Sequence, residues 1–285
     1  MARKRQSYDV LIVGGGPVGL TMALALHRSM PDLRVAICDR RPFTVPNDAR
    51  AFALGAGVTR VLEALDVWDA VAPDAAPIAR MEITDSGKDD ISRPLFLSFD
   101  GDVLPGRPYA HMVPNRSLTA ALLAVMHGEV DLIAPATVSG FAAGSATSNV
   151  MLEDGSLIET PLVVAADGGH SALRNMAGIT TIDHDYEQAG LVTTISHALP
   201  HNQTAWEHFR PSGPFASLPL SGDQAGGKRQ VSPPVVSCRG SPEPSWLATY
   251  SSYSPLASLS HATLRPSGDQ VTWISRASGV CEILR

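Results

Sequence analysis

The hydrophobic pattern near the N-terminus is a short apolar run followed by a glycine-rich stretch. Val10–Val13 predicts a buried parallel strand, and Leu20–Leu26 predicts the helix after it. Between them, Gly14, Gly16 and Gly19 have the spacing of a dinucleotide-binding turn. In such a turn the first glycine permits the tight bend, the second admits a pyrophosphate, and the third lets the helix pack closely on the strand. A strand-to-helix turn that binds nothing is the alternative.

A second apolar run, Leu33–Cys38, predicts the next strand and ends at Asp39. An acidic residue about 20 positions after the last glycine hydrogen-bonds a ribose in dinucleotide-binding proteins. The order of strand, glycines, helix, strand and acid therefore favours dinucleotide binding.

Later segments alternate between helical and strand patterns. Apolar residues at helical spacing predict one helix that contains Val58, Val61, Leu62 and Leu65. A second helix is predicted from Asn115 to Gly128, which would be its C′ residue. The stretch from 76 to 112 consists of short strand-like pieces separated by Gly and Pro, and 191–220 has the same texture. These two stretches predict a second, sheet-rich region.

The stretch before residue 175 contains a hairpin signal and another buried strand. Asp154-Gly155 lies between two apolar pieces and predicts a hairpin with a type I′ turn. Leu162–Ala166 then predicts a parallel strand that ends at Asp167 and Gly168, where open α/β sheets bind ligands. Ser171 is expected to cap the short helix that follows.

Charge, hydropathy and the positions of cysteine and histidine argue against several classes of protein. A net charge of −6 over 285 residues gives no sign of a nucleic-acid-binding face. No apolar run reaches the roughly 18 residues of a membrane-spanning helix. The three cysteines are far apart, which favours a reducing cytosol. We expect no metal site, because Pro200 interrupts the helix that would present His197 and His201 together.

Several motifs together resemble one family, the FAD-dependent hydroxylases of ubiquinone biosynthesis, which are flavin monooxygenases similar to p-hydroxybenzoate hydroxylase. The resemblance extends from about Tyr8 to about Gly222. The motifs are the Gly14–Gly19 turn, Asp39-Arg40-Arg41, Arg50-Ala-Phe-Ala-Leu54, Val113-Pro-Asn-Arg116-x-Leu118, Ala166-Asp167-Gly168-x-x-Ser171-x-x-Arg174 and Gly213-Pro-Phe-Ala-x-Leu-Pro-Leu220.

The resemblance implies an α/β fold, with a Rossmann-like FAD-binding domain of the glutathione-reductase type and an inserted β-sheet substrate domain. The FAD-binding domain is expected at 1–75 and 113–180, and the substrate domain at 76–112 and 181–225.

By the same resemblance, the cofactor is FAD and NAD(P)H is a co-substrate. The residues implied in cofactor binding are Gly14, Gly15, Gly16 and Gly19 at the pyrophosphate, Asp39 at the adenosine ribose, Arg50 on the flavin side, Asp167 and Gly168 at the ribityl chain and the NAD(P)H path, and additionally Arg40 and Arg116. Arg50 fits a surface role equally well.

The implied reaction is reduction of FAD by NAD(P)H and transfer of one oxygen atom from dioxygen to a phenol ring. No side chain is singled out as a catalytic acid or base. The substrate class is a polyprenylated phenol, which suggests a cytoplasmic protein with peripheral membrane contact, in a biosynthetic complex.

The resemblance stops near Asp223, where the chain becomes rich in serine and proline. The family's second flavin motif is absent after Leu220. We therefore expect a C-terminally truncated or frame-shifted chain whose residues 226–285 are largely disordered or non-native, with weak FAD retention. A divergent tail that folds is the alternative.

Two other functions fit parts of the pattern. An NAD(P)-dependent dehydrogenase would use the same strand, turn and helix, but would give no reason for Asp167-Gly168. An inactive remnant that acts as an interaction partner in a biosynthetic complex would fold without a cofactor.

Overall fold

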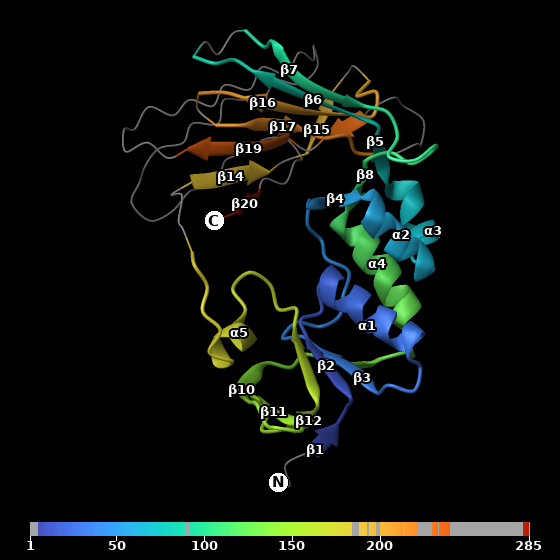
Figure 1. The fold of residues 1–285 in the computed structure, drawn as a ribbon, viewed down its shortest axis with the longest axis vertical. Coiled ribbons are helices and arrows are strands. Elements are labelled where there is room, and N and C mark those ends of the chain that lie inside the picture. Colours follow the sequence, from blue (N-terminus) through green and yellow to red (C-terminus); the bar gives the residue numbers. More distant parts are fainter. Residues whose placement is uncertain are drawn as a thin grey trace. The chain divides into compact units, whose positions relative to one another are not determined.

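In a computed structural model of the chain, the described residues divide into two compact units, which are considered one at a time (Figure 1). The residues described are 5–88, 92–183, 188–192, 194–197, 200–211, 213–221, 230–232, 234–239 and 282–284. The first unit consists of Met1–Asp48, Val58–Pro73 and Asn115–Asp183, and the second of Ala49–Gly57, Asp74–Pro114 and His184–Arg285.

The centre of the first unit is a four-stranded parallel sheet with the order β13-β2-β3-β9. All positions of β2 and β3 are buried, as expected of parallel strands covered on both faces. The register aligns the last residues of the four strands, so the loops after them leave from one edge. The strands are β2 (Val10–Val13), β3 (Val35–Cys38), β9 (Asp131–Ile133) and β13 (Leu162–Ala165).

Helices cover one face of this sheet. α1 (Pro17–Ser29) packs on β2 and β3 and also contacts α4 (Asn115–Met126). α1 begins three residues earlier than Leu20, because Pro17 has the backbone angle that suits the first helical position. The other helices of the described chain are α2 (Ala56–Ala64), α3 (Trp68–Val71), the 3₁₀ helix η1 (Ala72–Asp74) and α5 (Ala172–Met176).

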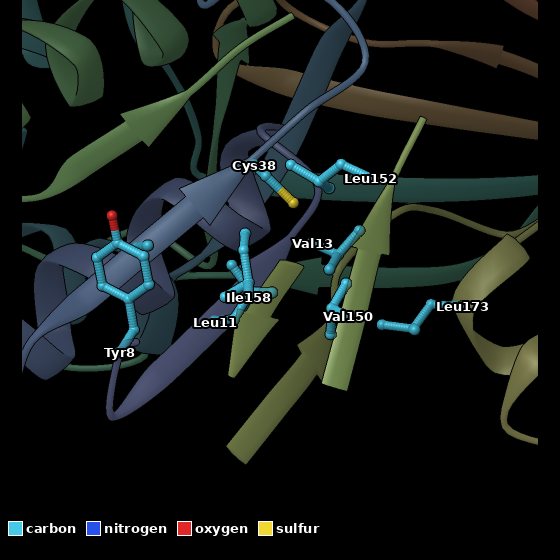
Figure 2. Close-up of a cluster of buried hydrophobic side chains, with 9 residues drawn as sticks. Tyr8, Leu11, Val13, Cys38, Val150, Leu152, Ile158 and Leu173 are labelled. Atoms are coloured by element: carbon cyan, nitrogen blue, oxygen red, sulfur yellow. The ribbon is translucent and has the colours of Figure 1, made fainter. Parts of the chain in front are cut away.

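The other face packs on a second sheet, with the order β1-β12-β11-β10. The side chains buried here come from β2 and β3 on one side and from β11 and β12 on the other (Figure 2). The strands are β1 (Arg5–Ser7), β10 (Val138–Ala142), β11 (Ser148–Leu152) and β12 (Leu157–Thr160). The cluster consists of Tyr8, Leu11, Val13, Ala36, Cys38, Val150, Leu152, Ile158 and Leu173.

The hairpin predicted around Asp154-Gly155 is present, since β11 and β12 pair antiparallel. The predicted type I′ turn is wrong, because such a turn needs positive φ at both central residues and only Gly155 has one, at 82°. Asp154 instead accepts hydrogen bonds from the Ser156 backbone N–H and hydroxyl, at 2.8 and 3.0 Å. These bonds fix the loop in a different turn.

The second unit is built on a seven-stranded sheet with the order β20-β14-β19-β17-β16-β6-β7. A three-stranded sheet, β4-β8-β5, and the pair β15-β18 accompany it. The strands are β4 (Ala51–Gly55), β5 (Ala76–Ile78), β6 (Arg80–Asp85), β7 (Leu95–Asp100), β8 (Ala110–Pro114), β14 (Gln188–Val192), β15 (Ile195–His197), β16 (Thr204–Phe209), β17 (Phe215–Ser217), β18 (Gln230–Ser232), β19 (Pro234–Arg239) and β20 (Glu282–Leu284).

A small apolar cluster joins the three-stranded sheet to the larger one. Ala76, Ile78 and Met112 contribute from β5 and β8, and Ala205 from β16, while Leu220 completes it. The second unit therefore has a core of its own, as a domain should.

Most of the predicted elements are present, and the α/β class is confirmed. Within the expected tail, the structure describes β18, β19 and β20; the remainder of 226–285 lies outside the described residues, so its predicted disorder is untested. None of the helices described is long and apolar enough to cross a membrane.

Replacing Ile158 by alanine should destabilise the first unit. Ile158 is fully buried between the two sheets, so truncation removes apolar contacts and leaves a cavity that costs about 2–5 kcal/mol. Urea unfolding measures the loss. Met151→Ala is the matched control, because Met151 lies on the same hairpin but is 43% exposed. Equal losses in both variants would contradict the assigned core.

Candidate functional site

The site begins at the turn between β2 and α1, where two glycines make close backbone contacts. Gly14 has a φ of 117°, and a Cβ there would lie 2.2 Å from the carbonyl oxygen of Ala166. A Cβ on Gly19 would lie 1.9 Å from the carbonyl oxygen of Gly14. Because real Cβ atoms do not approach oxygen so closely, both positions require glycine.

Gly16, the residue before α1, faces open space. A Cβ at this position would meet no atom within 4 Å. None of the described side chains caps the helix here, and its first turn contains no acidic residue. The N–H groups at a helix N-terminus without a cap attract anions, and phosphates bind there in many nucleotide sites.

Asp39 lies beside this turn, directly after β3. Its Oδ2 accepts a 2.7 Å hydrogen bond from the Gly15 N–H, and its Oδ1 accepts one of the same length from the Arg41 N–H. A carboxylate has room for further donors, so these bonds orient Asp39 and leave it able to bind a hydroxyl.

The pairing of β13 with β2 brings Asp167 next to the glycine turn. The Ala166 N–H donates to the Val13 carbonyl at 2.7 Å, and an ideal Cβ on Gly14 would be 2.7 Å from the Asp167 nitrogen. Asp167 Oδ2 accepts a 3.2 Å hydrogen bond from the Leu173 N–H at the start of α5. The Asp167 Oδ1 atom is buried and has no hydrogen-bond partner in the described part of the chain.

The loop after Asp167 is ordered by its own side chains. Gly168 has a φ of 94°, in the left-handed region. Ser171 caps α5 as predicted, with its hydroxyl accepting a 3.0 Å hydrogen bond from the Arg174 N–H. With Asp167 and Ser171 both bonded to α5, the loop holds Asp167 in a defined orientation.

The two carboxylates also act on Cys38, the last residue of β3. Burial, followed by the charges of Asp39 and Asp167, raises the pKa of the Cys38 thiol to about 12. The thiol is therefore protonated at physiological pH, as is typical of a core residue rather than a nucleophile.

The three arginines predicted to bind the cofactor are less closely tied to this turn. Arg40 follows Asp39 and is exposed, and Arg116 is an exposed residue in the first turn of α4. Arg50 belongs to the second unit, one residue before β4. Their roles in cofactor binding remain predictions.

A buried polar network near the start of α4 was not predicted. The Asn115 Nδ2 donates to the Asp48 carboxylate at 3.0 and 3.2 Å, and Asn115 Oδ1 accepts a 3.2 Å hydrogen bond from the Thr119 hydroxyl. In the sequence, Asn115 and Thr119 could be recognised only as residues near the start of a helix. No pattern in the sequence connects them with Asp48, 67 positions away.

The residues at this edge of the parallel sheet fit a dinucleotide. The open N-terminus of α1 suits a pyrophosphate, and the Asp39 carboxylate suits a ribose hydroxyl. The buried Asp167 Oδ1 provides a further acceptor that only an external donor could satisfy, since no described residue does so. The fold and site thus define a dinucleotide-binding α/β protein.

Comparison with known families specifies the class further. Residues 7–231 match the family model described as an FAD binding domain. The chain therefore belongs to this family, and FAD is confirmed as the cofactor that the family binds.

Curated relatives align over about three quarters of the chain. A ubiquinone hydroxylase, UbiL, of Rhodospirillum rubrum is 34% identical over 223 residues, which cover 76% of this chain and 50% of UbiL. The 3-demethoxyubiquinol 3-hydroxylase of Escherichia coli is 30% identical over 221 residues, covering 75% of this chain and 55% of the enzyme. The chain thus spans about half the length of these relatives.

Solved structures show the same fold at low identity. Pseudomonas aeruginosa PqsL, in complex with 2-aminobenzoylacetate, has a TM-score of 0.68 and 22% identity, covering 82% of this chain and 61% of PqsL. The flavin-dependent monooxygenase PieE, in complex with FAD and substrate, has a TM-score of 0.61 and 18% identity, covering 81% and 43% of the two chains. These likenesses support the α/β fold.

Replacing Gly16 by alanine should lower FAD affinity about tenfold or more, without loss of folding. The added methyl group enters the open space in front of α1 and keeps a phosphate from the backbone. Quenching of flavin fluorescence measures affinity, and circular dichroism checks the fold. Gly57→Ala is the control, since a Cβ at Gly57 also meets nothing within 4 Å. Unchanged affinity in Gly16→Ala would exclude this location.

The Cys38 thiol should resist alkylation in the folded protein up to about pH 9. With a pKa of about 12, it has almost no thiolate at that pH, and it is fully buried. In urea the thiol is exposed and its pKa falls to about 8.5, so iodoacetamide should modify it. Peptide mass spectrometry locates the label. Rapid labelling of native Cys38 would contradict the assigned environment.

Proposed function

We propose that the chain is the FAD-binding part of a monooxygenase that hydroxylates a phenol ring in ubiquinone biosynthesis. The observation that carries this proposal is the buried Asp167 Oδ1 next to the glycine turn, which has no hydrogen-bond partner among the described residues, in a chain of the FAD binding domain family. Relatives named as ubiquinone hydroxylases support the reaction class.

In this proposal, residues on the two sides of the glycine turn bind different parts of FAD. Gly14 and Gly19 shape the turn, while the backbone at Gly15 and Gly16 binds the pyrophosphate. Asp39 binds the adenosine ribose. Gly168 and Asp167 lie on the other side of the turn, and Asp167 Oδ1 accepts a hydrogen bond from a ribityl hydroxyl.

The bound FAD would supply the redox chemistry, receiving electrons from NAD(P)H and delivering an oxygen atom from dioxygen to the ring. The protein's contribution is to bind the cofactor, orient the aromatic substrate and exclude water. We assign substrate binding to the sheet-rich second unit, as expected from the resemblance. Arg50 and Arg116 are proposed as additional cofactor contacts.

The substrate class suggests where the protein works. A phenol with a polyprenyl chain partitions into membranes, so we propose a cytoplasmic protein that contacts the membrane surface and takes part in a biosynthetic complex. Lack of binding to lipid vesicles would exclude the membrane contact.

Replacing Asp167 by asparagine tests the proposed cofactor site. Asparagine keeps one oxygen, which can still accept from the Leu173 N–H at the start of α5, but replaces the second acceptor with a donor. We expect normal folding and about a tenfold loss of FAD affinity, the size of one lost charge-assisted hydrogen bond. FAD titration with fluorescence detection measures this loss.

Asp154→Asn is the matched control, because Asp154 also bonds a local backbone N–H but lies in the β11–β12 loop. Equal FAD affinity in Asp167→Asn and the wild type would contradict the assignment. Tight binding of NAD(P)H in the absence of FAD would favour a dehydrogenase, and a folded chain with no affinity for either nucleotide would favour an interaction protein.

A further inference from the structure

One face of the seven-stranded sheet presents apolar side chains around the carboxyl group of Glu207. Alternate residues of a strand share a face, and the register places Glu207 of β16 between Ile83 of β6 and Ala216 of β17. Two residues earlier on the same strands, Met81 and Ala205 extend this face. Glu207 is thus surrounded by apolar neighbours within the sheet.

The apolar surface continues onto the edge strand β7. Leu97 pairs with Ile83 and Phe99 pairs with Met81, so both side chains lie on the Glu207 face. They are 42% and 40% exposed, respectively. At β7 the face therefore offers hydrocarbon surface that is open to a ligand, whereas Met81 and Ala205 pack against the three-stranded sheet.

The side chain of Glu207 is itself half-buried. Burial raises the pKa of its carboxyl group, and no described residue gives it a hydrogen bond or an ion pair. A second carboxylate on this face, Asp85, is exposed at the end of β6 and accepts a 2.7 Å hydrogen bond from the Gly87 N–H. A polar group partly withdrawn from water with no partner is costly, which points to a use in binding.

We propose that Glu207 accepts a hydrogen bond from the phenol hydroxyl of the substrate, while the apolar side chains of this face hold the ring and its hydrocarbon substituent. The inference rests on the proposed function, which requires a phenol with an apolar chain. It adds the residue that fixes the orientation of the ring and selects a phenol over its ether.

The face matches both the apolar part and the hydroxyl group of this ligand. Binding sites for small molecules combine mostly apolar walls with a few polar groups that set orientation. A carboxylate is a strong acceptor for a hydroxyl donor, and this hydrogen bond needs no proton transfer. A methyl ether has no hydrogen to donate, so it would leave the carboxylate unpaired and bind more weakly.

The test compares binding of ortho-prenylphenol with binding of its methyl ether to the full chain in the presence of FAD, by isothermal titration calorimetry. We expect the wild type to bind the phenol about tenfold more tightly than the ether, as one charge-assisted hydrogen bond predicts. In Glu207→Leu the two compounds should bind equally. Glu207→Gln keeps the shape of the side chain and a weaker acceptor, so it should retain part of the preference.

Glu82→Gln is the control and should behave as the wild type, because Glu82 lies on β6 with its side chain on the opposite face, in register with Trp206. A phenol preference that persists in Glu207→Leu would overturn the inference, as would equal binding of phenol and ether by the wild type. Failure of both compounds to bind would also overturn it. The separate FAD titration of Asp167→Asn would still decide the proposed function.

Discussion

The close approach of the β2–α1 turn to the end of β13 is the constraint on which the candidate site depends. Gly14 packs its backbone against the Ala166 carbonyl at a distance that no side chain would permit. The parallel pairing of β2 with β13 imposes this contact, because both strands end at the same level. Through it, residues more than 150 positions apart lie close together.

The two carboxylates at this edge, Asp39 and Asp167, form different sets of hydrogen bonds. Asp39 uses both oxygens to fix the backbone of its own loop and of the glycine turn. Asp167 uses one oxygen to accept a hydrogen bond at the start of α5, while the other is buried and has no partner in the part of the chain that the structure describes. Between them, Cys38 remains a neutral core thiol, so the anionic groups at the sheet edge are not accompanied by a reactive nucleophile.

The sequence predicted this edge well because the signals are local. Apolar runs marked β2, β3 and β13, and the glycine spacing marked the turn between β2 and α1. Contacts between residues far apart in the sequence could not be predicted. No sequence pattern connects Asn115 with Asp48, and none places Glu207 on an apolar face. The type I′ turn failed for a local reason, since the Asp154 side chain bonds Ser156 and holds a different conformation.

The hydrogen bond between Asn115 and Asp48 joins two points where the polypeptide passes between the units. The chain leaves the first unit after Asp48, returns to it for Val58–Pro73, and crosses back once more at Asn115, which is in direct contact with Asp48. Between these neighbouring points, the described residues of 49–114 contribute no strand to the parallel sheet of the first unit. Segments in this range can therefore be exchanged or lengthened with little disturbance to the four strands of the nucleotide-binding framework.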